Sequence, residues 1–194
     1  MTTPSPLERP CLPKGDPMRH LPLAALESAL ATLPAPPTTT GSVALLVRRC
    51  ADGRRETPSH VTLTQAEGVP GDRWRERLPL NPEAQITVMR RDVGELVANG
   101  QPLTHFGDNL VVDLDLSDEN LPPGTRLRIG AARVEVTPKP HTGCLKYKDR
   151  FGADALRFVS TREALAANLR GIHVRVIEDG EVAVGDAILV ERSG

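Results

Sequence analysis

Short apolar segments alternate with polar ones along residues 41–194, and this pattern predicts a domain made mostly of β-strands. Within the segments, apolar side chains recur at every second position, as they do along a strand with one buried face. Many short strands with few helices are typical of a β-barrel, so we expect a mostly β, barrel-like domain with a few short helices. The expected strands are 42–47, 85–89, 110–116, a hairpin of 126–129 and 133–137, then 172–176, a return strand at 182–184 after a hairpin turn at 179–180, and a closing strand at 187–190.

The first 40 residues differ from the rest because they hold nine of the 18 prolines. Proline lacks the N–H that helices and sheets use, so most of this stretch is expected to be irregular. One exception is 21–33, where Leu23, Leu26 and Leu30 recur at helical spacing. We favour packing of this helix on its own domain over docking of a partner. Two parts are therefore expected, a Pro-rich extension over 1–40 and a barrel-like domain over 41–194.

Two further helices are expected within the second part. The first spans 92–98. Ser160 and Glu163 have the spacing of a capping box, which predicts a helix over 161–169 with Gly171 as its C-terminal cap.

Composition and charge exclude several classes of function. The chain has 194 residues, of which 39% are hydrophobic and 25% are charged, and its formal net charge is −1. A charge near zero argues against a general nucleic-acid binder. No apolar run approaches the roughly 20 residues that span a bilayer, and the proline-rich start differs from a signal peptide. The three cysteines are too few and too widely spaced for a disulfide framework, so we expect a cytoplasmic protein with free thiols and no membrane contact.

The segment TPKPHTGCLKYKDR, residues 137–150, carries the strongest chemical signal. Its prolines and its glycine place Cys144 on a loop after a strand. Three of the four lysines of the chain fall in this segment, and positive neighbours stabilise the thiolate, the form that attacks and binds metals. The alternative is that Cys144 is a small buried apolar residue, the commoner fate of a free cysteine. The local residues alone support both alternatives equally.

A zinc site is another interpretation of the same segment, because His141 and Cys144 have a spacing seen among zinc ligands. Two more ligands would have to come from elsewhere, and no C-x-x-C pair is present, so we favour zinc less. Cys11 and Cys50 lack comparable surroundings and are interpreted as incidental.

Two short loops place an acid next to glycine. GVPGDRW, residues 68–74, is expected to turn tightly, and such turns can hold an anion through backbone N–H groups. GDNL, residues 107–110, precedes a strand, where its polar side chains can bond the loop backbone or a ligand. Taken alone, each loop is more often a plain turn. The candidate residues in these loops are Gly71, Asp72, Arg73, Asp108 and Asn109.

Five motifs in this order resemble the MOSC family, named for the C-terminal domain of the molybdenum-cofactor sulfurase. They are GVPGDRW, GDNL, LPPGTRLRIGAARVEVT, PHTGCLKY and RGIHVRVIEDGEVAVGD, and the resemblance covers roughly residues 41–190. The HTGC variant, followed by RFG and a helix, is similar to small stand-alone bacterial members. The resemblance implies a β-barrel with a pocket lined by these loops. It also implies that Cys144 matches the family's functional cysteine, which ligates molybdenum or is proposed to carry sulfur.

The resemblance further implies a site for the molybdenum cofactor (molybdopterin) around Cys144. Arg73 and Lys146 would meet the pterin phosphate. This chain departs from the family in having Asp108 where Glu is usual and Trp74 where His is common. Larger members also carry an N-terminal β-barrel domain that helps hold the cofactor, and residues 1–40 cannot supply it, so we expect weak binding and loss on purification. The implied cofactor-binding residues are Gly71, Asp72, Arg73, Asp108, Asn109, His141 and Lys146.

Three hypotheses of function follow. The first is a molybdenum-cofactor-dependent reductase of N-hydroxylated small-molecule substrates, with the Cys144 thiolate as the soft metal ligand. It requires an external electron-donor protein, because the cysteines are too few for a four-thiolate iron–sulfur cluster. The second is a carrier that holds a persulfide on Cys144 and receives it from a sulfur donor. The third is a binding module whose pocket holds an anion while residues 1–40 recruit a partner.

Overall fold

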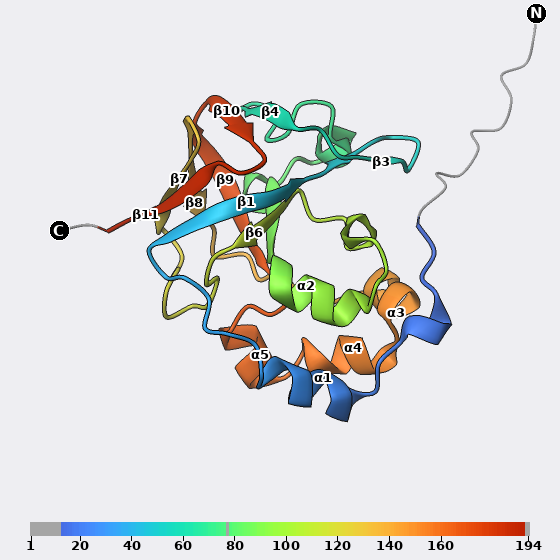
Figure 1. Ribbon diagram of the computed structural model, residues 1–194. Helices are drawn as coiled ribbons and strands as arrows, with labels where there is room; N and C mark the ends of the chain where they lie inside the picture. The colour runs from blue at the N-terminus through green and yellow to red at the C-terminus, as the bar shows by residue number, and fades with distance from the viewer. Residues whose placement is uncertain (1–12, 77, 193–194) are drawn as a thin grey trace, which may run out of the picture.

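Seven strands form a closed barrel in the computed structural model, which describes residues 13–76 and 78–192. Around the barrel their order is β1, β11, β7, β8, β9, β5, β6, and β6 pairs again with β1. The predicted mostly β barrel with a few short helices is therefore confirmed (Figure 1). Cys11 and the first 12 residues of the predicted extension lie outside the described residues, and the boundary at residue 40 stays a prediction. The barrel strands are β1 (Thr40–Leu46), β5 (Ile86–Arg90), β6 (Leu110–Asp113), β7 (Arg126–Ile129), β8 (Ala132–Val136), β9 (Ile172–Glu178) and β11 (Ala187–Glu191).

One neighbouring pair in the barrel is parallel. β5 and β6 run in the same direction, whereas the other barrel pairs are antiparallel. Parallel neighbours need a crossover connection, and α2 (Arg91–Ala98) supplies it. The loop that follows this helix ends at Gly107–Asn109, just before β6, so the crossover brings the GDNL motif to one end of the barrel.

Two small sheets lie outside the barrel. β2 (Arg48–Arg49) pairs with β3 (Arg55–Glu56), and β4 (His60–Leu63) pairs with β10 (Gly180–Ala183). The hairpin predicted at 179–180 is therefore wrong, because β10 follows β9 after Asp179 and pairs with β4 instead of folding back on β9. The backbone N–H of Gln65 donates to Asp179 Oδ1 (2.8 Å), which ties the junction of β9 and β10 to the end of β4.

The five α-helices of the described residues gather on one side of the barrel (Figure 1). A second apolar core, separate from the barrel interior, fills the space beneath them and includes Leu26, Phe106, Tyr147, Phe151 and Phe158. The helix near the N-terminus packs on its own domain, as favoured from the sequence, because Leu26 is fully buried in this core. The helices are α1 (Leu23–Leu30), α2, α3 (Leu145–Phe151), α4 (Ala153–Phe158) and α5 (Arg162–Ala166), with 3-10 turns η1 (Pro17–Arg19), η2 (Arg73–Glu76), η3 (Pro82–Ala84) and η4 (Leu103–His105).

The predicted helix over 161–169 is shorter than expected, and its cap lies one residue later. Thr161, not Ser160, caps α5: its side chain accepts from the N–H of Ala164 (3.1 Å). The Ser160 hydroxyl instead donates to the carbonyl of Leu156 (2.6 Å), at the end of α4. The C-terminal cap predicted at Gly171 is also wrong, because α5 ends at Ala166, well before it. None of the described helices is long and apolar enough to cross a membrane.

Candidate functional site

A cavity of about 240 Å³ opens beside Cys144, and we call it the cationic cavity. Its walls come from β2 and β3, from β5 and the loop before β6, from η2, and from α3. Two histidines and the rings of Trp74, Phe106, Tyr147 and Phe151 also line it, and none of its described lining residues is acidic. Its positively charged lining residues are Arg49, Arg55, Arg73, Lys146, Arg150 and Arg170. Such a wall favours an anionic ligand.

Cys144 is exposed and occupies the N-cap position of α3. Its backbone is extended, and its carbonyl accepts from the N–H groups of Tyr147 (2.9 Å) and Lys148 (3.0 Å), so the first turn of the helix fixes its place. The sequence placed Cys144 on a loop after a strand, and it does lie between β8 and α3. The alternative of a small buried apolar residue is wrong. The residue lines the cationic cavity and is also exposed to solvent.

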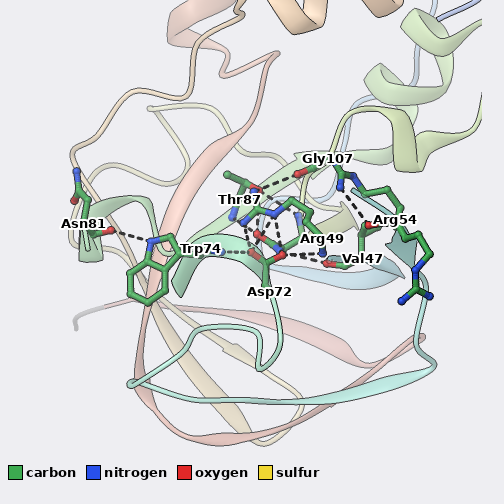
Figure 2. Close-up of polar contacts among 10 residues, drawn as sticks. Val47, Arg49, Arg54, Asp72, Trp74, Asn81, Thr87 and Gly107 are labelled. Carbon is green, nitrogen blue, oxygen red and sulfur yellow. Dashed lines mark hydrogen bonds and ion pairs between the residues drawn. The ribbon is translucent and has the colours of Figure 1, made fainter. Parts of the chain in front are cut away.

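Asp72 lies behind the cavity wall, where it holds Arg49 in place (Figure 2). The Arg49 guanidinium donates to both carboxylate oxygens, through Nη2 (2.7 Å) and Nε (2.8 Å). The backbone N–H groups of Arg49 and Trp74 and the Asn109 side-chain amide donate as well, each at 2.9 Å. Burial alone would raise the pKa of Asp72, but these bonds and the charge of Arg49 outweigh it and hold the pKa below its ordinary value.

Asn109 links the Asp72–Arg49 pair, which we call the brace, to the barrel. Its Oδ1 accepts from the N–H and the hydroxyl of Thr87, both at 3.2 Å, and its amide donates to the carbonyl of Val47 (3.2 Å). Every part of the side chain is therefore used within the protein. Asp72 and Asn109 position Arg49 and the ends of two strands, and neither lines the cavity.

Asp108 plays a similar part for Arg170. It is almost fully buried and accepts from Arg170 Nη1 at 2.6 Å. The Arg170 guanidinium also lies 5.2 Å from the centre of the Tyr147 ring, a cation–π distance. His141 Nε2 lies 3.6 Å from Asp108 Oδ1, too far for a hydrogen bond, and this oxygen has no hydrogen-bond partner in the described chain.

His141 is held in its neutral form. Burial, and then the positive charge of Arg170, keep its pKa well below the ordinary value for histidine. The nearby Asp108 carboxylate does not reverse this, because Arg170 already pairs with its charge. The His173 ring lies 4.6 Å away, and burial lowers its pKa as well. The cavity wall thus has two neutral imidazoles among its cations.

Segment 13–20 braces Arg150 from outside. Arg150 Nε donates to the carbonyl of Pro13 (3.3 Å), and the Arg150 carbonyl accepts from His20 Nε2 (3.1 Å). A Cβ atom on Gly15 would overlap the Arg150 backbone, so the two segments touch directly. Arg150 Nη1 donates to the His105 carbonyl (2.6 Å), which fixes the guanidinium at the cavity. Part of the predicted Pro-rich extension therefore supports a residue of the cavity wall.

Several cations of the cavity remain without enough partners. Nε of Arg55 and Nε of Arg170 are buried and have no hydrogen-bond partner among the described residues. Burial, and then repulsion from Arg150, Arg49 and Arg73, lowers the pKa of Arg55 to about 10. Buried donors without acceptors and crowded positive charges both cost free energy that a bound anion would relieve.

Four of the eight residues singled out from the sequence line the cavity: Cys144, Arg73, His141 and Lys146. The other four lie outside its lining: Asp72, Asp108 and Asn109 are buried braces, and Gly71 is an exposed turn residue with a positive φ of 77°. Sequence reasoning missed Arg49, Arg55, Arg170 and His173, which come from other segments than the one that carries Cys144. Binding of a cofactor by any of the eight residues singled out from the sequence stays a prediction. In residues 13–76 and 78–192, no three His, Cys, Asp or Glu side chains cluster so as to hold a metal ion, so the zinc interpretation gains no further ligands.

The closed barrel, with an exposed cysteine beside a cationic cavity, defines a small barrel domain with a thiol at its candidate site. The chain belongs to the MOSC domain family, whose model matches residues 71–189. This family is generally linked to binding of the molybdenum cofactor.

Solved structures support the fold. The chain is similar to the YuaD protein from Bacillus subtilis, with a TM-score of 0.60 and 18% identity over 80% of this chain and 97% of that one. It is also similar to a hypothetical protein (TM-score 0.61, 21% identity, 81% of this chain and 71% of that one). YiiM from Escherichia coli gives a TM-score of 0.55 and 19% identity over 79% of this chain and 71% of that one. No curated protein matches the chain.

Proposed function

We propose that this protein binds the molybdenum cofactor, with Cys144 as the metal ligand, and reduces N-hydroxylated compounds. The observation that carries the proposal is the exposed Cys144 thiol at the edge of a cavity with six cationic side chains and no acidic one among its described lining residues. Membership of the MOSC family supports it, since the family is linked to this cofactor.

The residues of the cavity fit the chemistry of the cofactor. A cysteine thiolate is a soft ligand suited to molybdenum. The pterin phosphate is an anion, and the unpartnered Nε groups of Arg55 and Arg170 are donors that a phosphate would satisfy. The cavity, about 240 Å³, is smaller than the roughly 300–1,000 Å³ of usual ligand pockets, so it would hold the phosphate end and leave part of the pterin outside. This arrangement agrees with the weak binding expected from the sequence.

The residues of the chain would bind the cofactor and hold it in its orientation. The bound cofactor would supply a centre that exchanges two electrons and accepts oxygen from the substrate. Arg73 and Lys146 would hold the phosphate, while Asp108 and Asp72 keep Arg170 and Arg49 aimed at the cavity. Trp74 and Phe106 exclude water from its inner wall. Reduction of an N-hydroxyl group to N–H consumes two electrons and two protons and releases water, so an external electron-donor protein is part of the proposal.

The test is metal and pterin content after expression in cells that make the cofactor. Wild-type protein and Cys50→Ser, the matched control, are expected to carry molybdenum and pterin, and Cys144→Ser is expected to lose the molybdenum. The loaded protein is then assayed with a competent electron donor and a panel of N-hydroxylated substrates. Equal molybdenum in Cys144→Ser would contradict the ligand assignment. Molybdenum without reductase activity would leave a cofactor-binding module.

A second candidate, a sulfur carrier, is favoured by the exposure of Cys144. A persulfide must be reached by a donor and then by an acceptor, and an exposed thiol allows both. Incubation with a cysteine desulfurase, followed by mass spectrometry, is expected to show an added sulfur on Cys144 that is absent from Cys144→Ser. Unmodified Cys144 after this treatment would exclude the carrier.

A further inference from the structure

A second cavity, of about 660 Å³, lies on the other side of the segment that leads to Cys144. We call it the apolar cavity. It is bounded by segment 136–142, by α5, and by residues between β6 and β7. Its apolar lining is formed by Leu121, Val136, Ile172, Leu165 and Ala166, together with three prolines. The volume falls within the roughly 300–1,000 Å³ typical of small-molecule sites.

Two positive charges at this cavity have no counter-ion. Lys139 and Arg162 line it, and no carboxylate of the described residues lies within ion-pair distance of either. Asp118 is the acidic residue of the described lining, and its Oδ1 accepts from Nδ2 of Asn168, another lining residue, at 2.8 Å. The cavity therefore combines a large apolar surface with an excess of one positive charge.

We propose that the apolar cavity binds a small organic anion with an apolar body, such as an aromatic carboxylate or sulfonate. The apolar body would lie on Leu165, Pro138 and Pro140, the exposed apolar residues of the lining, where burial of apolar surface gives most of the affinity. The anionic group would lie near Lys139 and Arg162. An inorganic anion would gain only the attraction to the two positive charges, and a neutral hydrocarbon would gain only the burial of apolar surface.

This site differs from the cationic cavity in chemistry and lies next to it. His141 lines both cavities, so one side chain forms the wall between them. Pro140 and Thr142 also line the apolar cavity, and Cys144 follows Thr142 by two residues. A ligand in the apolar cavity would thus contact the segment that carries the candidate thiol. The inference needs no molybdenum and stands apart from the proposed function.

The test is a fluorescence titration of the full chain, without cofactor, with 8-anilinonaphthalene-1-sulfonate. The expected result is one bound probe per chain. Lys139→Ala and Arg162→Ala are each expected to weaken binding roughly twofold to fivefold, as for exposed ion pairs. Ala166→Phe, which fills the cavity from an exposed position at the end of α5, is expected to weaken it by more than tenfold. Arg73→Ala, in the cationic cavity, is the matched control and is expected to leave the affinity unchanged.

Other results would overturn the proposal. The cationic cavity also attracts anions, so loss of probe binding in Arg73→Ala with full binding in Ala166→Phe would place the probe there instead. Displacement of the probe by sodium sulfate, beyond the effect of sodium chloride at equal ionic strength, would show that the apolar body is not needed. Absence of saturable binding would reject the site. Circular dichroism of each variant separates loss of binding from loss of fold, and the two charge variants change exposed side chains only.

Discussion

Replacement of Asp72 by alanine should destabilise the protein strongly, because five donors converge on this carboxylate. Three belong to Arg49, and the others are the backbone N–H of Trp74 and the amide of Asn109. The Asp72 side chain is 1% exposed and the Arg49 side chain 10% exposed, so water cannot replace the lost acceptor. Breaking a buried ion pair by removal of one partner costs about 3–5 kcal/mol, and we expect the Asp72→Ala loss in that range.

Urea unfolding, followed by circular dichroism and by the fluorescence of Trp74, measures this loss. Asp52→Ala is the matched control, since it removes an aspartate–arginine pair with both side chains more than half exposed and should leave the stability unchanged. A loss below about 1 kcal/mol in Asp72→Ala would refute the role of the brace, because a buried pair of this kind is worth more.

Because the Asp72 carboxylate is paired in the folded state, part of the free energy of unfolding should depend on acid pH. The pKa of Asp72 is lowered in the folded state, so the unfolded chain binds a proton more readily. This stability is complete above the unfolded pKa, about 3.9, and is lost as the pH falls through the lower folded value. The stability of Asp72→Ala should therefore fall less than that of wild type between pH 5 and pH 3.

Two further predictions concern the walls of the cationic cavity. Gly15→Val should push segment 13–20 away from Arg150, lower the melting temperature, and weaken the binding of inorganic phosphate measured by calorimetry, whereas Ala24→Val on the exposed side of α1 should do neither. Wild-type stability should fall as the pH drops below about 6.5, because the histidine is protonated in the unfolded chain while His141 stays neutral in the folded protein. The loss is up to about 1.4 kcal/mol per pH unit for each buried neutral histidine. His141→Gln should reduce this slope between pH 7.5 and 5.5, and an unchanged slope would show that His141 is charged in the folded protein.

Some barrel strands could be predicted because one face lies in the core and burial repeats with a period of two, whereas β5 is buried at all five positions. Residues 126–137 are the clearest case: β7 and β8 show alternate burial and lie where the alternation placed them. The pairing of β10 could not be predicted in this way. The Asp179-Gly180 turn is a local signal, but the partner strand β4 is more than 100 residues away in the sequence.

The helices next to Cys144 left no clear signal in the sequence. α3 has seven residues and α4 has six, and Gly152, with a positive φ of 95°, separates them. Helices of this length are marginal on their own, and packing in the second apolar core stabilises them. The residues alone therefore predicted a loop at Cys144, and only the family resemblance implied a helix after RFG.

Cys144, the centre of the candidate site, could be predicted from the sequence, whereas most residues of the cavity walls could not. The local lysines drew attention to Cys144, yet of the three only Lys146 lines the cationic cavity. Most of its positive charge comes from arginines such as Arg49 and Arg170, which lie far apart in the sequence and meet only in the folded protein. The acids next to glycine indicated a ligand, whereas their role in the structure is to hold these arginines.

Closure of the barrel has a consequence for the synthesis of the protein. β11 pairs with both β1 and β7, so these two strands keep an open edge until the last strand arrives. The ribosome releases β11 after every other strand of the barrel, and the entropy of joining such distant segments slows the final step. An open sheet edge can pair with another chain. The nascent barrel is therefore most exposed to aggregation, and most dependent on chaperones, in the interval before β11 is made.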